Sequence, residues 1–114
     1  MASATIALNG NLSGAVDLGI YQPGNKIVGF IMPSGWDAAA LTFQVCDTVD
    51  GTFVNLYDDN NTEVSLSAAA SRAIGLRKDQ SDVLGRWRFI KVRSGPASSP
   101  VTQTVERIIK IVVK

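Results

Sequence analysis

Residues 41–57 read LTFQVCDTVDGTFVNLY, and this stretch decides the fold class. Leu41, Phe43 and Val45 alternate with polar residues, which places three apolar side chains on one face of a strand. The pair Asp50-Gly51 is typical of a tight turn, because glycine tolerates the positive φ that such turns require. We therefore predict a β-hairpin over residues 41–57.

Short apolar runs bounded by turn residues continue on both sides of this hairpin. They cover residues 5–8, 16–20, 26–32, 63–66, 73–76, 86–93 and 101–113. No long amphipathic helix is predicted, although residues 79–82 favour a short helical turn. About eight short strands in 114 residues predict an all-β fold, namely an antiparallel β-sandwich that is jelly-roll-like.

Three of these runs carry further information. Residues 26–32 are apolar on both faces, which predicts a central strand covered on both sides. In the run 101–113, Val105, Ile109 and Ile111 share one face, while Ile108 lies on the other, so the second face is also expected to be partly covered. In the run 86–93 the alternation changes phase, which predicts a β-bulge near Phe89.

The length of 114 residues predicts a single core and hence one domain. We expect residues 15–114 to form this single β-sandwich domain. Residues 1–14 are expected to be an extended N-terminal segment that reaches onto a neighbouring subunit. The N-terminal residues show neither the basic start nor the long apolar stretch of a signal peptide, so we expect synthesis and folding in a cytoplasm.

The sequence contains no histidine and a single cysteine, Cys46. A serine or cysteine nucleophile usually needs an imidazole base, and a zinc site usually needs histidines or several cysteines. We therefore expect no enzymatic activity, no catalytic residues, no cofactor and no metal. The acids between Asp47 and Glu63 leave two alternatives open, which are ordinary turn chemistry and a calcium site.

The net charge of +1 conceals an asymmetry between the two parts of the chain. Residues 1–71 hold one basic residue and seven acids, whereas residues 72–114 hold ten basic residues and three acids. Three alternatives follow: pairing of opposite charges within the chain, self-association or docking on an acidic surface, and nucleic-acid binding. No nucleic-acid-binding motif supports the third alternative, and no apolar run is long enough to span a membrane.

Trp36 and Asp37 are the candidate contact residues for a partner or a glycan. They lie in a predicted loop after Pro33, where an exposed aromatic ring suits a sugar or a protein surface. The alternative is that Trp36 covers one end of the sandwich. Trp87 alternates with arginines in a predicted strand, and we expect it in the core.

Residues 35–46, 50–58 and 93–103 resemble a pattern in small virion proteins of tailed bacteriophages. In this pattern a Trp precedes small residues, a Leu-Thr-Phe-Gln strand follows, and an Asp-Gly turn leads to a Phe and a Leu-Tyr pair. The hairpin is also similar to one in discoidin-like, jelly-roll carbohydrate-binding modules. The resemblance implies a structural protein of the particle, either a capsid decoration or cement subunit or the base of a head fibre.

In that role the protein would reside in the virion. Its partners would be the major capsid protein or other virion proteins, and it would form a homo-oligomer, a dimer or a trimer. The alternative is a carbohydrate-binding or receptor-contacting module of a phage tail or fibre, with Trp36 and Asp37 at the contact.

Overall fold

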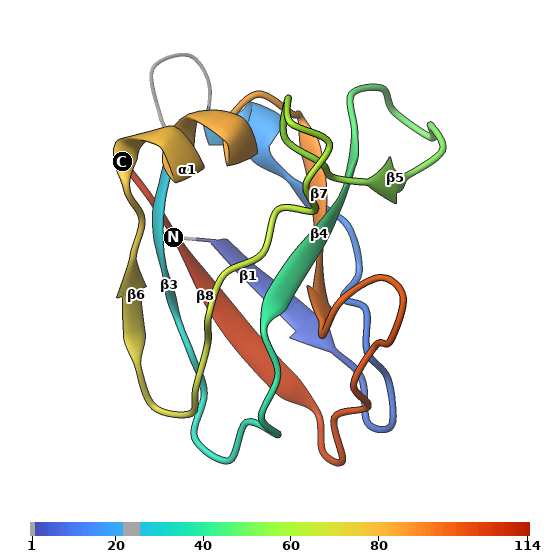
Figure 1. The fold of residues 1–114 in the computed structure, drawn as a ribbon, viewed down its shortest axis with the longest axis vertical. Helices are drawn as coiled ribbons and strands as arrows, with labels where there is room; N and C mark the ends of the chain where they lie inside the picture. The colour runs from blue at the N-terminus through green and yellow to red at the C-terminus, as the bar shows by residue number, and fades with distance from the viewer. Residues whose placement is uncertain (1, 22–25) are drawn as a thin grey trace.

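The computed structural model describes residues 2–21 and 26–114, and within them the chain forms eight strands and two short helices (Figure 1). The strands are β1 (Ala2–Ile6), β2 (Val16–Asp17), β3 (Ile27–Ile31), β4 (Leu41–Cys46), β5 (Val54–Asn55), β6 (Ala73–Gly75), β7 (Phe89–Ser94) and β8 (Arg107–Val113). The helices are the 3-10 helix η1 (Leu18–Tyr21) and α1 (Lys78–Leu84). None of the described helices is long and apolar enough to cross a membrane.

The strands form two antiparallel sheets of four strands each. One sheet has the order β1-β8-β3-β6 and the other has the order β2-β7-β4-β5. Apart from the β4–β5 hairpin, every connection crosses from one sheet to the other, which is the strand order of a jelly roll. The predicted all-β, antiparallel, jelly-roll-like sandwich of eight strands is confirmed.

The core lies between the two sheets. Phe30 of β3 and Phe43 of β4 meet across it with ring centroids 5.8 Å apart, and both rings are fully buried. Ile90 and Val92 of β7 face Ile109 and Ile111 of the other sheet in the same cluster, and all four are fully buried. The core is thus built from the inward-facing residues of each alternating strand, as period-two patterning requires.

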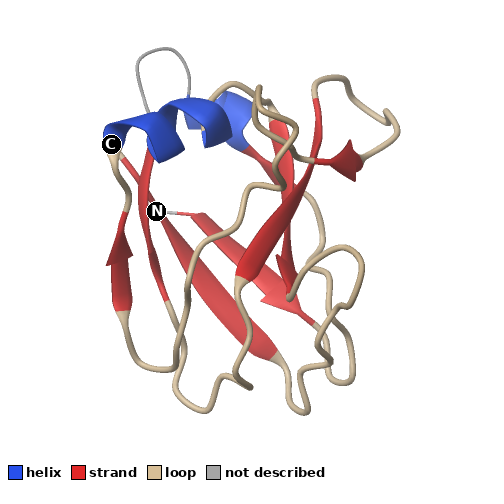
Figure 2. Cartoon of the chain, viewed as in Figure 1, coloured by secondary structure: helices blue, strands red, loops and turns tan. Residues whose placement is uncertain are grey.

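Helix α1 lies across one end of the sandwich (Figure 2). Its first turn is held by the Gln80 side chain, which accepts a hydrogen bond from the Arg77 backbone N–H at 3.0 Å. Gly85 follows the last turn, and Leu84 at that turn is fully buried. The short helical turn predicted over residues 79–82 is therefore confirmed, and its apolar end closes the core.

The N-terminal segment differs from the prediction of a separate extension over residues 1–14. Residues 2–6 form β1, which pairs with β8 from Ala2 opposite Ile111 to Ile6 opposite Arg107. Ala4 and Ile6 are buried in the core. The run predicted over residues 5–8 overlaps only the end of this strand, because alternation over five residues, with alanine as one inward residue, is too weak a signal to set its bounds.

Several predicted elements differ from expectation. The return strand of the hairpin is reduced to β5, and the strand predicted over 101–113 begins at Arg107, which leaves Val105 53% exposed in a loop. No bulge forms near Phe89, because β7 begins there and the preceding residues belong to the connection from α1. The irregularity lies instead in β3, where the register against β8 shifts between Ile27 and Gly29.

Candidate functional site

Trp36 is buried, with only 5% of its surface exposed, and belongs to the core cluster. Its indole N–H donates a hydrogen bond to the Ala39 carbonyl oxygen at 3.1 Å. Of the two alternatives for this residue, the structure therefore favours the one in which Trp36 covers an end of the sandwich. A ring in this position is not available for stacking on a sugar.

Asp37 joins the loop before β4 to the loop before β8. Its carboxylate accepts hydrogen bonds from the Thr104 backbone N–H at 2.7 Å and the Thr104 hydroxyl at 3.0 Å, and it pairs with Arg107 at 3.5 Å. The hydrogen bonds from Thr104, aided by the Arg107 charge, lower the pKa of Asp37 although desolvation opposes the shift. The fully buried Gln103 side chain bonds both the N–H and the carbonyl oxygen of Asp37. Asp37 thus acts as a clamp between loops.

The charge asymmetry is partly internal. Four ion pairs join the acidic part of the chain to the basic part: Arg88–Asp17 at 3.3 Å, Arg93–Glu63 at 3.1 Å, Arg107–Asp37 at 3.5 Å and Lys26–Asp82 at 3.0 Å. They support the alternative of pairing within the chain for three of the seven N-terminal acids.

Arg93 forms the most buried of these pairs, and no local sequence pattern indicates it. Its side chain is only 6% exposed, and it donates to Thr42 Oγ1 at 2.9 Å, Asn55 Oδ1 at 2.8 Å and Glu63 Oε2 at 3.1 Å. Glu63 also accepts the backbone N–H of Ala97. This network therefore connects β7, β4 and β5 with two loops.

Asp58, one of the acids that left a calcium site open, is engaged in a turn. Asp58 Oδ1 accepts the backbone N–H groups of Asn60 at 2.9 Å and Thr62 at 3.0 Å, and Asn61 has a φ of +59°. Asx turns of this kind explain an Asp/Asn cluster without a metal. Over residues 2–21 and 26–114, no three acidic or cysteine side chains are grouped to hold a metal ion.

An open cavity of about 310 Å³ lies between α1 and the segment that follows β5. Tyr57, which is 46% exposed, and the half-buried Trp87 line it. Leu56 and Val83 contribute apolar surface, and the charged lining residues are Asp58, Asp59 and Arg86. The sequence predicted Trp87 in the core, but the residue is only partly buried. It lies in the connection from α1, before β7 begins.

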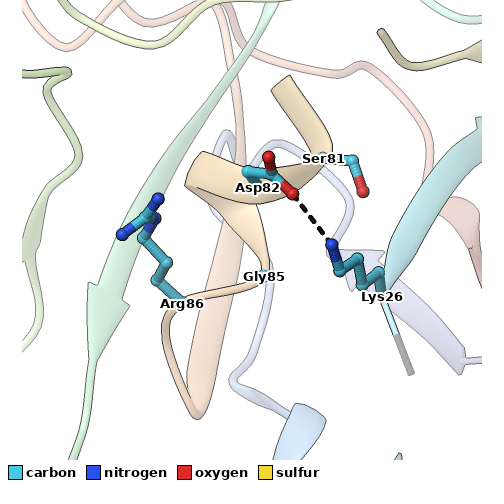
Figure 3. A pocket seen from close by; sticks show the side chains of 5 residues that line it. All are labelled: Lys26, Ser81, Asp82, Gly85 and Arg86. Atoms are coloured by element: carbon cyan, nitrogen blue, oxygen red, sulfur yellow. Dashed lines mark hydrogen bonds and ion pairs between the residues drawn. The ribbon is translucent and has the colours of Figure 1, made fainter. Parts of the chain in front are cut away.

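Two further cavities flank this one on the same end of the sandwich. The first, of about 220 Å³, shares Asp58 and Val83 with the aromatic cavity, so the two adjoin. The second, of about 190 Å³, is crossed by the ion pair of Lys26 with Asp82, while Arg86 points away from that pair (Figure 3). Hydrogen bonds from Lys26 and then Lys78 lower the pKa of Asp82. The ionised carboxylate is therefore already paired with cations of the chain.

The outer face of the β1-β8-β3-β6 sheet is exposed and poor in charge. The register places Ile108 beside Thr5, and Ile31 between Lys110 and Ala73. Ile108 is 48% exposed and Ile31 is 38% exposed. The described strands thus present one flat, mainly uncharged surface with Lys110 as its charged residue.

Searches of protein-family models, curated proteins and solved structures found no match to this chain.

Proposed function

We propose that the protein is a structural subunit of a tailed-bacteriophage particle, a capsid decoration or cement protein that acts through protein–protein interfaces. Two things support this proposal before any surface is considered. The stretches 35–46, 50–58 and 93–103 resemble small virion proteins, and eight-stranded jelly rolls are frequent among viral capsid and lectin domains. Fold alone does not define function, so the argument depends on the surface.

The observation that carries the proposal is the outer face of the β1-β8-β3-β6 sheet. The sequences of β3 and β8 place apolar residues on both faces, and the core covers only one face. Ile31 and Ile108 remain exposed on the other face, next to the small residue Ala73. Exposed apolar surface of this kind marks an interaction site.

A second copy of the chain is the proposed occupant of this face. Sheets stack face to face at about 10 Å, and two flat faces poor in charge can pack in this way without burying unpaired ions. Lys110 does not prevent this, because a lysine stem can cover apolar surface while its ammonium group reaches solvent. Dimers formed in this way would then dock on the capsid.

The test is the mass of the protein in solution, measured by light scattering after size-exclusion chromatography. We expect the wild-type chain to run as a dimer, and the double variant Ile31→Lys, Ile108→Lys to run as a monomer. Val49→Lys is the matched control, because Val49 is 61% exposed on the β4–β5 turn, away from this face. A wild-type monomer, or assembly unchanged in the double variant, contradicts the interface.

The place in the particle has its own test. Electron microscopy of purified particles should find the protein in many copies on the capsid surface. Absence from mature particles, or presence in only a few copies, contradicts the decoration role. A few copies at the tail would instead favour the alternative, a carbohydrate-binding or receptor-contacting module. In that alternative the buried Trp36 ring would not be the contact surface, whereas the Asp37 side chain is 34% exposed.

A further inference from the structure

We propose that the cavity between Tyr57 and Trp87 is a binding site for one ring of a neutral saccharide. This site lies at the α1 end of the sandwich and is separate from the sheet face assigned to assembly. It also differs from the loop of Trp36, where sequence alone placed the glycan contact.

The size of the cavity fits a small ligand. Its volume of about 310 Å³ is at the lower limit of ligand pockets, which run from about 300 to about 1,000 Å³. The cavity is open to solvent on one side, so a ring at the end of a longer glycan can enter while the rest stays outside. The adjoining cavity of about 220 Å³ offers space for a neighbouring ring.

The aromatic lining supplies surface for the apolar side of a sugar. Tyr57 and Trp87 are both partly exposed, and each combines a flat apolar body with a polar group at its edge. A pyranose ring carries C–H bonds on one face and hydroxyls around its rim, so it can stack on such a body. Leu56 and Val83 add apolar surface beside the two rings.

The polar lining supplies partners for hydroxyl groups. Asp58 is held in place before any ligand binds, because its Oδ1 already accepts two backbone N–H groups of its own turn. Its second oxygen accepts no hydrogen bond from the described residues. Asp59 adds a further carboxylate, and Arg86 adds guanidinium donors. A carboxylate that accepts hydrogen bonds from two sugar hydroxyls sets the orientation of a ring that is otherwise held by apolar contacts.

The charge of the lining selects the class of sugar. Two carboxylates against one guanidinium leave a negative excess at the cavity. An acidic sugar or a phosphate group would meet like charge there, whereas a neutral ring would not. The inference is therefore for hexoses and N-acetylhexosamines, and against sialic acid.

The experiment measures saturation-transfer NMR on the full chain with glucose, galactose, mannose, N-acetylglucosamine and sialic acid as separate probes. We expect transfer to at least one neutral sugar, with a Kd of about 1 mM for a single ring, and none to sialic acid. Trp87→Ala should abolish this transfer. Tryptophan fluorescence of the Trp36→Phe variant, in which Trp87 is the one tryptophan left, should respond to the same sugar.

Two charge-matched variants keep the test independent of folding. Asp59 and Asp50 are both exposed, but only Asp59 lines the cavity. Asp59→Asn should weaken the sugar at least about fivefold, as expected for one lost hydrogen bond to a charged group, while Asp50→Asn should leave binding unchanged. The inference is overturned if no neutral sugar binds, if sialic acid binds in preference, or if binding is the same in both variants and in Trp87→Ala.

Discussion

Asp37, Gln103 and Arg93 show how single polar side chains fix the loops of this sandwich. Gln103 is fully buried, yet its amide bonds both backbone groups of Asp37 and the Ser94 hydroxyl. The guanidinium group of Arg93 similarly donates hydrogen bonds to three partners. Among the described residues no buried side-chain polar atom lacks a partner. These contacts explain why long connections can be well ordered between short strands.

The acid limb of the stability curve should reflect Asp17, Asp37 and Asp82. Their pKa values are lowered in the folded protein, for Asp17 chiefly by hydrogen bonds from Arg88. A lowered folded-state pKa gives stability that is present above the ordinary aspartate pKa of about 3.9 and is lost as the pH falls through the folded-state value. Because the sequence lacks histidine, we expect a melting temperature that is nearly constant from about pH 5 to about pH 7 and falls below about pH 4.

Asp37→Asn provides the control for that curve. This variant should melt at a lower temperature at neutral pH and lose less of its stability on acidification, because one of the three shifted carboxyls has been removed. Thermal melts followed by circular dichroism across the pH range measure both effects. If the melting temperatures of the wild type and the variant fall equally on acidification, Asp37 does not contribute to the pH dependence of stability.

Arg93→Met should be strongly destabilising. The change leaves Glu63, whose side chain is only 19% exposed, without its cation, and a broken buried pair costs about 3 kcal/mol. Urea denaturation measures the free energy of unfolding. Arg77→Met is the control, because both members of its pair are 73% exposed and such pairs contribute less than about 1 kcal/mol. Equal losses in the two variants would contradict the role assigned to Arg93.

At this scale the sequence predicts apolar residues better than polar ones. Leu41, Phe43 and Val45 are buried as their alternation indicated. Trp87 departs from expectation, and the sequence left two alternatives open for Trp36, because exposure of a loop aromatic depends on how the loop folds back, which no local pattern encodes. Arg93 could not be anticipated either, since its partners come from three other parts of the chain.

At the scale of elements, the pairing of β3 with β6 depends on a glycine. Gly29 lies opposite Gly75 in this pair, and a Cβ added to Gly29 would be only 2.6 Å from the Ile74 carbonyl oxygen. The same position carries the register shift of β3 against β8. A side chain at Gly29 would therefore force apart the central strand and its edge neighbour.

Gly29→Ala should lower the free energy of unfolding by about 1–3 kcal/mol through this clash. Gly75→Ala is the matched control in the same strand pair, because nothing lies within 4 Å of a Cβ added there. The control should leave stability unchanged or raise it by up to about 1 kcal/mol. Urea titrations of both variants measure the free energy of unfolding. An unchanged free energy of unfolding in Gly29→Ala would mean that β6 is not held against β3.

Elements were predictable from sequence where a strand has several alternating residues. The bounds of β4 agree with the prediction, and β3 and β6 agree within a residue or so. β1 and β5 were misjudged, because two to five residues leave the period undetermined and pairing with a distant strand decides their extent. The phase change near Phe89 was real, but it marks the start of β7.

For the whole molecule, the structure changes the meaning of the charge asymmetry. Four ion pairs join the two parts of the chain within one molecule, so much of the attraction between them is used in the fold. The surface assigned to assembly is instead poor in charge. The charge asymmetry behind the net charge of +1 is therefore partly balanced within one molecule.

Assembly should accordingly resist salt. Raising NaCl from about 0.1 M to about 1 M shortens the Debye length from about 10 Å to about 3 Å, which weakens contacts between exposed charges but not contacts between apolar faces. Sedimentation velocity at both salt concentrations should give the same oligomer. An oligomer that dissociates as salt rises would assign assembly to opposite charges on different copies.

The position of β8 has a consequence for the order of events during synthesis. This strand is the last in the sequence, yet it lies inside its sheet, with β1 on one side and β3 on the other. Until residues 107–113 leave the ribosome, β1 and β3 have no strand between them, and two sheet edges stay open. The β1-β8-β3-β6 sheet is therefore completed by a late and distant pairing of the kind that is slow in all-β proteins. During that interval the open edges of β1 and β3 are exposed, and contact between neighbouring nascent chains on the polysome would favour aggregation.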